Sequence, residues 1–262
     1  MARNSLKNVF RLIDEAKQSQ SVEQSFLSDL KRSIELTDEK NSRKPSQTYK
    51  PSSLNCIRNM YFQVTGQEPD KANSSACLVG ICESGTDRHE RVQNAVSHMK
   101  DNRIDCEYVD VAKYVKSRNL DYLEVVSKQG YETKLYHKTL NMSFLCDGII
   151  RYKGKYYILE IKTESIYKWQ NRHNVNEAHY NQATAYSTAL GIDNVIFLYI
   201  NRDNTDMKAF LFTVTDSMKA ELVGKIEECD EYVRNLTCPP KPENADNKMC
   251  QYCSYRNSCR KC

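Results

Sequence analysis

The chain has 262 residues, of which 40% are hydrophobic and 27% charged, so it can bury the core of one large domain or two small ones. No run of about 18 apolar residues is present and the first residues lack the apolar block of a secretory signal, which predicts a cytosolic protein without a transmembrane helix. The net charge of +4 permits an anionic partner without requiring one.

The chain is rich in cysteine, with eleven in total. Disulfides are uncommon in the cytosol, and an odd number fits a disulfide framework poorly. Metal ligation is therefore the better explanation for at least some of these residues. The cysteines expected to be small buried hydrophobes are Cys77, Cys82, Cys106, Cys146 and Cys229.

The pattern divides the chain into residues 1–50 and residues 51–262. Apolar residues such as Phe26 and Leu30 recur at helical spacing in the first part, which predicts a helical arm. From Thr37 to Pro51 the chain is charged, rich in Ser and Lys, and interrupted by proline. This composition predicts a linker or mobile loop between the two parts.

The second part opens with a predicted loop and short helix that meet at Cys56. Further along, Asp87 and Glu90 have the spacing of a capping box, which predicts a helix start with His89 in the first turn. The apolar residues that share the helix face of His89 are Val92, Val96 and Met99. We therefore expect this histidine to point toward the core.

A β-hairpin is predicted in the middle of the chain. Its two strands cover Ser143–Tyr152 and Lys155–Thr163, and a tight turn at Lys153-Gly154 joins them. Two further strand candidates, Tyr122–Ser127 and Glu132–Leu140, lead into the hairpin.

The second hairpin strand carries charges where a core strand would not. A period of two places Ile158, Glu160 and Lys162 on one face, and buried charges are costly without a partner. A divalent metal would suit Asp147 and Glu160, with Lys162 facing a substrate phosphate. The alternative is a surface hairpin with its charges in water, since Glu-x-Lys occurs roughly once by chance in a chain of this length.

Helices and strands alternate after the hairpin. The predicted elements are a helix over 177–190 that ends at Gly191, a buried strand over 195–200, a strand over 208–214, and a helix over 216–235 capped by Asp216. Together with the hairpin they predict an α/β fold with a mixed sheet flanked by helices. Before the first of these helices, Trp169, Arg172 and His173 form a basic and aromatic segment that would suit single-stranded DNA or a solvated loop equally.

The tail contains a C-x2-C-x5-C motif formed by Cys250, Cys253 and Cys259. Cys56 is a candidate fourth ligand, and four thiolates suit zinc or an iron–sulfur cluster. Such a clip would close a loop of about 190 residues and stabilise the domain by about 4–5 kcal/mol. The alternative is a self-contained zinc knuckle in which Cys262 is the fourth ligand.

Taken in order, these motifs resemble those of the RecB-type nucleases of the PD-(D/E)xK superfamily. The similar proteins are CRISPR-associated RecB-like exonucleases, their phage-encoded relatives and the nuclease domain of AddB. The residues that carry the resemblance are His89, Asp147, Glu160-x-Lys162, Gln182-x-x-x-Tyr186, Cys56 and the tail motif. The match spans about Cys56 to Cys259, and Cys146 replaces the usual proline before the first aspartate.

The resemblance implies a restriction-endonuclease-like mixed sheet, with residues 1–50 as an added arm. It implies that a cation is held by His89, Asp147, Glu160 and the carbonyl of Ile161. Carboxylates suit Mg²⁺ or Mn²⁺, and an imidazole favours Mn²⁺. The resemblance assigns catalytic support to Lys162, which would activate water or stabilise phosphate charge, and to Gln182 and Tyr186, which would contact substrate or orient that lysine.

The resemblance further implies a [4Fe–4S] cluster on Cys56, Cys250, Cys253 and Cys259, with zinc as the alternative. The expected activity is exonuclease action on single-stranded DNA or DNA ends, with 5′-to-3′ polarity, in a bacterial, archaeal or phage-infected cell. The alternatives are an endonuclease of the same fold and a non-cutting DNA-binding subunit of a recombination or CRISPR-adaptation complex. Expected partners are DNA and either further copies of the chain or another protein of such a complex, with no membrane.

Overall fold

The computed structural model describes residues 21–41, 45–70, 75–242, 250–251 and 253–262. Contacts divide the chain into two compact units. The smaller unit contains residues 1–43 and 73–83, and the larger contains residues 44–72 and 84–262. The larger unit holds both sheets and every predicted site residue.

The smaller unit contains helix α2 (Val22–Asn41) and the beginning of helix α4 (Ala76–Ser97). Glu35 of α2 accepts a hydrogen bond from the backbone nitrogen of Ala76 at 3.0 Å. The prediction of a helix is confirmed over α2, and its apolar side chains, such as Phe26, are exposed. The part of the predicted arm before Ser21 lies outside the described residues.

Helix α4 begins much earlier than the capping-box pattern predicts. Ser75 Oγ accepts a hydrogen bond from the backbone nitrogen of Leu78 at 3.3 Å, which is the interaction of a helix N-cap. Asp87 therefore lies in the helix interior, and the prediction of a start there is wrong. Gly85 also lies within the helix, where a Cβ would come within 3.4 Å of Thr163 Oγ1.

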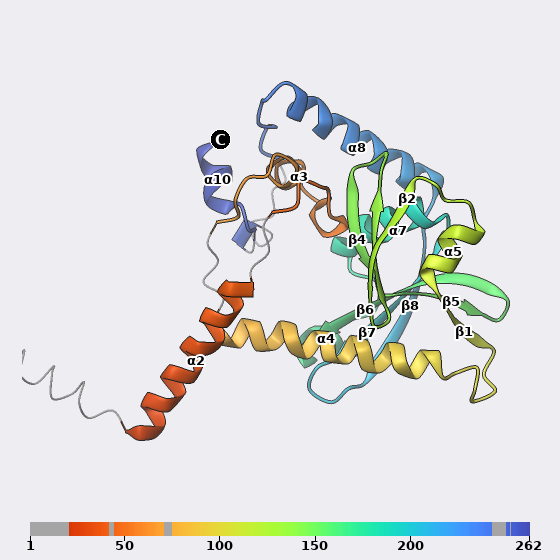
Figure 1. Cartoon of the computed structure of the whole chain (residues 1–262), viewed down its shortest axis with the longest axis horizontal. Coiled ribbons are helices and arrows are strands. Elements are labelled where there is room, and N and C mark those ends of the chain that lie inside the picture. The colour runs from red at the N-terminus through yellow and green to blue at the C-terminus, as the bar shows by residue number, and fades with distance from the viewer. Residues whose placement is uncertain (1–20, 42–44, 71–74, 243–249, 252) are drawn as a thin grey trace, which may run out of the picture. The chain divides into compact units, whose positions relative to one another are not determined.

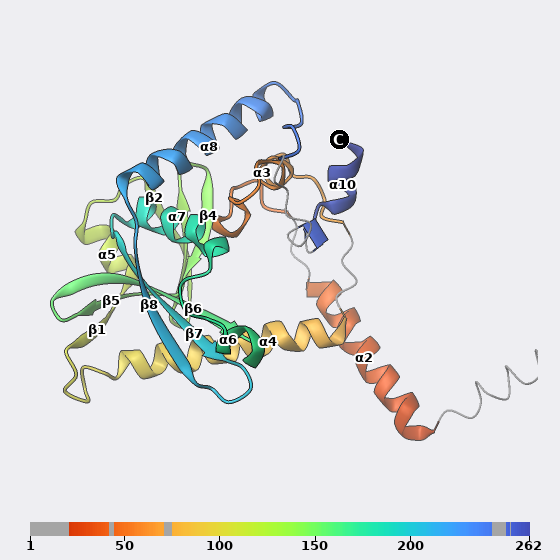
Figure 2. The same ribbon diagram turned by 180° about the vertical axis from the view of Figure 1, so that it is seen from behind.

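The larger unit is built on a five-stranded sheet with the order β1-β5-β6-β7-β8. Figures 1 and 2 show this sheet from opposite sides. Its strands are β1 (Cys106–Val109), β5 (Gly148–Tyr152), β6 (Lys155–Glu164), β7 (Asn194–Asn201) and β8 (Met207–Thr213). β6 and β7 are parallel and the other neighbours antiparallel, so the predicted mixed sheet is confirmed. The turn residues Lys153 and Gly154 have φ of 50° and 79°, as the tight hairpin turn requires.

A second, antiparallel sheet has the order β2-β3-β4. Its strands are β2 (Leu123–Gln129), β3 (Glu132–His137) and β4 (Met142–Cys146). The predicted single strand Ser143–Tyr152 is therefore wrong, because β4 and β5 belong to different sheets and the chain passes between them at Asp147. The carboxylate of Asp147 accepts the backbone N–H of Ile161 at this point.

The predicted linker, Thr37 to Pro51, is structured at both of its ends. Helix α2 already covers its first residues, and Tyr49 forms a bridge to Met142 of β4. Tyr49 is fully buried and donates a hydrogen bond to Asp230 Oδ1 at 2.6 Å. This aromatic ring anchors the end of the predicted linker in the core.

Helices cover both faces of the five-stranded sheet. Besides α2 and α4, the described helices are η1 (Pro51–Ser53), α3 (Ile57–Val64), α5 (Val111–Ser117), α6 (Ile166–Gln170), η2 (Glu177–His179), α7 (Tyr180–Leu190), α8 (Asp216–Arg234) and α10 (Arg256–Lys261). Ile158 lies in the core with α5, α7 and α8, while Leu159 and Ile161 pack toward Val92 of α4. The predicted alternation of β6 is therefore confirmed, and so is the flanking of the sheet by helices.

The predicted end of one helix is confirmed, and the predicted cap of another is wrong. Helix α7 ends at Gly191, whose φ of 66° is the left-handed conformation expected of a C-terminal glycine. Helix α8 is capped by Thr215, whose hydroxyl accepts from the nitrogen of Met218, so the prediction of Asp216 as the cap is wrong. Asp216 instead places its charge in the first turn, where the helix dipole favours it.

Candidate active site

Asp147 is held in place from three elements. Its Oδ2 accepts a hydrogen bond from the nitrogen of Ile161 on β6 at 2.8 Å. Its backbone carbonyl accepts from Gln93 of α4 at 2.7 Å and from Tyr108 of β1 at 2.6 Å. The next residue must be small, since a Cβ on Gly148 would lie 2.8 Å from the Tyr108 hydroxyl. The carboxylate is thus fixed at the junction between the two sheets.

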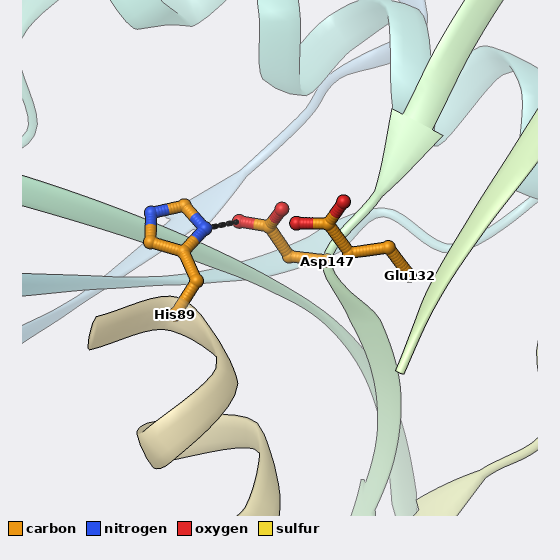
Figure 3. Close-up of side chains that lie close together, drawn as sticks. All are labelled: His89, Glu132 and Asp147. Carbon is orange, nitrogen blue, oxygen red and sulfur yellow. Dashed lines mark ion pairs between the residues drawn. The ribbon is translucent and has the colours of Figure 1, made fainter. Parts of the chain in front are cut away.

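His89 reaches Asp147 from α4, as Figure 3 shows, with 3.5 Å between Nδ1 and Oδ2. Burial alone would lower the pKa of His89. The hydrogen bond and charge of Asp147 and the charge of Glu160 outweigh burial, so the pKa is raised. The expectation that this histidine points inward is confirmed, because only 22% of its side chain is exposed.

Glu132 is part of the same cluster, and the sequence reasoning missed it. One ligand atom from each of His89, Glu132 and Asp147 lies within 4.8 Å of the others. Burial and the negative charge of Asp147 raise the pKa of Glu132. The available signal was strand register: Thr133 pairs with Cys146, which sets Glu132 beside Asp147.

Glu160 lies on β6 with 3% of its side chain exposed. Its Oε1 accepts hydrogen bonds from Lys162 Nζ at 2.6 Å and from Gln182 Nε2 at 2.7 Å. Its Oε2 is buried and has no hydrogen-bond partner among the described residues. Burial, followed by the charge of Asp147, raises the pKa of Glu160 to about 8.

Gln182 of α7 connects the lysine to a buried phenol. Its Oε1 accepts from Lys162 Nζ at 3.0 Å, and its Nε2 donates to Tyr186 Oη at 2.7 Å as well as to Glu160. Burial raises the pKa of Tyr186 well above its usual value, so this hydroxyl stays neutral. Gln182 thereby fixes where the Lys162 ammonium lies.

The predicted residues from α4, β6, α7 and the β4–β5 junction therefore meet in one place. Three carboxylates and an imidazole supply the hard oxygen and nitrogen ligands that divalent cations prefer. The unpartnered Glu160 Oε2 also fits a cation, because a buried carboxylate oxygen without a partner is unfavourable. The cluster can hold a metal.

Two of the three residues in the basic and aromatic segment, Trp169 and Arg172, make contacts within the protein. Trp169 donates to the carbonyl of Tyr199 at 3.2 Å, and Arg172 forms an ion pair with Glu164 at 2.6 Å. The Arg172 guanidinium also lies 4.9 Å from the centre of the Tyr199 ring. Of the three residues predicted to contact DNA, His173 is the exposed one.

A second candidate site contains four cysteines. Cys56 is the N-cap of α3, and together with Cys250, Cys253 and Cys259 it lines a cavity of about 500 Å³. Cys262 is instead joined to Cys238 in a disulfide. The structure therefore places Cys56, rather than Cys262, at the cavity with the tail motif.

The remaining cysteines divide into two groups. Cys106, Cys146 and Cys229 are buried, as predicted. Cys77 and Cys82 are exposed on α4, so the prediction that they are buried is wrong. Residue type is a poor guide there, because apolar neighbours such as Leu78 are exposed as well.

Comparisons with known proteins identify no family for this chain. No family model matches the chain, and no curated protein matches it. The crystal structure of SSO0001 is similar over 90% of this chain and 97% of that chain, with 17% sequence identity and a TM-score of 0.49. None of the described helices has the length and apolar content needed to cross a membrane.

Proposed function

We propose that this protein is a metal-dependent DNA nuclease that hydrolyses phosphodiester bonds in single strands or at DNA ends. One observation carries the proposal: a buried carboxylate with an unpartnered oxygen, Glu160, lies beside a lysine and near a second carboxylate, Asp147. A structural ion pair would not need a further acidic group, an imidazole and an amide around it. A centre for phosphoryl chemistry uses carboxylates to hold a cation and a fixed positive charge to stabilise the phosphate.

The residues that would hold the cation are His89, Asp147, Glu160 and the carbonyl of Ile161, as the resemblance implies, together with Glu132 from the geometry. Mn²⁺ and Mg²⁺ both suit these donors. When bound, the cation would polarise the phosphoryl oxygen and lower the pKa of a bound water.

Lys162 has a separate role that follows from its contacts. Glu160 and Gln182 hold its ammonium in one position, so the positive charge is in place before substrate arrives. A fixed charge stabilises the negative charge that develops on the phosphate without reorganisation during the reaction. Gln182 acts by positioning this lysine, and Tyr186 by positioning Gln182.

Asp147→Asn and Lys162→Met test the proposal in a Mn²⁺-dependent assay with end-labelled linear single- and double-stranded DNA. We expect each to lower nucleotide release at least ~100-fold, because each removes a charge from the centre. Asparagine at 147 can still accept the N–H of Ile161, so the fold is retained. Asp121→Asn, at an exposed position, should cut like the original protein.

Equal nucleotide release by the original protein and both variants would contradict the proposal. If no protein cuts but all bind labelled DNA, the chain is a non-cutting DNA-binding subunit. Digestion of circular single strands would identify an endonuclease, because an exonuclease requires a free end.

Glu132→Gln is expected to weaken Mn²⁺ binding about tenfold or more, because a neutral amide replaces one of the carboxylates of the cluster. Electron paramagnetic resonance of free Mn²⁺ measures this affinity without any substrate. Glu124→Gln is the matched control, since Glu124 is exposed on the adjacent strand β2. Equal affinity in the two variants would show that Glu132 is not a ligand.

We also propose that the four cysteines hold a [4Fe–4S] cluster. Tetrahedral zinc, with Zn–S bonds of about 2.3 Å, would bring the sulfur atoms to about 3.8 Å from one another. Among the described cysteines, no three sulfur atoms all lie within 4.8 Å of one another. The wider spacing and the cavity of about 500 Å³ support a larger group than a single ion.

A further inference from the structure

Arg58 carries a buried guanidinium beside the four cysteines. It lies in the first turn of α3, two positions after Cys56, and is 8% exposed. Its Nη1 donates to the sulfur of Cys259 at 3.3 Å and to the carbonyl of the same residue at 2.7 Å. The guanidinium also donates to the carbonyl of Pro239 at 2.7 Å and to a backbone oxygen of Cys262, the last residue of the sequence, at 3.3 Å.

These contacts join distant parts of the chain. Arg58 belongs to the start of the larger unit, whereas all three of its partner residues belong to the C-terminal tail. The planar fork of a guanidinium can bond several acceptors in fixed directions, which a lysine cannot do. Arg58 therefore sets where Cys259 lies relative to Cys56.

The charge of Arg58 requires a negative partner. A buried cation without one is unfavourable, and no carboxylate side chain among the described residues forms an ion pair with Arg58. The cavity wall adds three more cations, Lys241, Arg256 and Arg260, and no acidic residue among those described. Four metal-bound thiolates would supply the missing negative charge.

We infer that Arg58 is the counter-cation and positioning residue of a metal–thiolate group held by Cys56, Cys250, Cys253 and Cys259. This inference rests on the metal site proposed above. The N–H donated to the sulfur of Cys259 and the positive charge favour the electron-rich thiolate. In an iron–sulfur cluster, both would raise the reduction potential.

The test compares Arg58→Gln, Arg58→Lys and Arg151→Gln in the full chain, purified without oxygen. Arg151 is the control because it is an exposed arginine of β5 that does not line the cavity. We measure iron, sulfide and zinc per chain, the rate of metal transfer to a chelator, and the reduction potential by titration followed near ~400 nm.

We expect Arg58→Gln to lose metal to the chelator at least tenfold faster than the original protein, with Arg151→Gln unchanged. The reduction potential of Arg58→Gln should fall, because the reduced cluster loses a favourable charge. A tenfold change in the ratio of reduced to oxidised cluster corresponds to about 59 mV for one electron. Arg58→Lys keeps the charge but lacks the fork. It should therefore lose metal faster than the original protein, while its reduction potential should fall less than that of Arg58→Gln.

The outcomes separate this inference from the metal proposal. If the original protein contains one zinc and no iron, the cluster proposal fails, and the rate of zinc loss still tests Arg58. If both Arg58 variants retain metal as the original protein does, the inference is overturned while the metal site stands. If Arg58→Gln does not fold, Arg58→Lys decides, and its metal retention must fall below that of Arg151→Gln. A protein without any metal at the cysteines would overturn both.

Discussion

Glu160→Gln is expected to abolish DNA cleavage and to remove a pH-dependent loss of stability from the metal-free protein. Burial raises the pKa of Glu160 to about 8 in the folded state, against 4.5 for the free side chain. Between these values the unfolded chain releases a proton that the folded chain retains, so the free energy of unfolding falls as pH rises. Glutamine resembles the protonated carboxyl group and has no such loss.

The measurement is urea unfolding of the metal-free proteins at pH 5 and pH 8. The stability of Glu160→Gln relative to the original protein should rise by at least about 1.4 kcal/mol over this interval, the equivalent of one pKa unit. Glu124→Gln, at an exposed position, should show no such rise. A constant difference between Glu160→Gln and the original protein would mean that Glu160 is charged in both states.

Adding Mn²⁺ at pH 8 should make the original protein more stable than Glu160→Gln, which reverses the order expected without metal. A cation that binds only the folded state stabilises it, and the charged form of Glu160 is the one that binds. The original protein should therefore gain stability with Mn²⁺ at pH 8, whereas Glu160→Gln should gain much less and should cleave DNA at least ~100-fold more slowly. Equal stabilisation of both proteins would exclude Glu160 as a ligand.

Cys56→Ser is expected to cause the largest loss of stability. Cys56 and the tail cysteines line one cavity, so a shared metal group would close a loop of about 190 residues and stabilise the fold by about 4–5 kcal/mol. Removing one ligand should therefore lower both the metal content and the unfolding temperature. Cys77→Ser, at an exposed cysteine, should change neither.

Metal analysis and thermal unfolding without oxygen measure both effects. The original protein should be brown and contain about four irons per chain, and Cys56→Ser should contain much less. One zinc in a colourless protein would contradict the cluster. A Cys56→Ser protein that retains all of its metal would show that the tail holds the metal without Cys56.

Local sequence determined several elements of this fold. The turn at Lys153-Gly154 requires positive φ at both residues, and the end of α7 requires it at Gly191, so short-range backbone preferences decide both. The alternation of Ile158 and Leu159 between the two faces of the sheet follows from the period of a strand. These features depend on neighbours in sequence, which periodicity describes well.

The site depended on contacts that no local pattern contains. The structure brings Glu132 to Asp147 through the register of β3 with β4, and it turns Trp169 and Arg172 inward through contacts with β6 and β7. Helix α4 begins next to Ser75, well before the capping-box spacing of Asp87 and Glu90 predicts a start.

The stretch from Cys146 to Thr163 shows the difference most clearly. Sequence spacing singled out Asp147, Glu160 and Lys162, but it described them as two strands of one hairpin. The tertiary structure decided that the chain changes sheets at Asp147, because its carboxylate binds the backbone of β6 and its carbonyl binds α4 and β1. Residue types determined the available chemistry, and long-range packing determined which side chains meet.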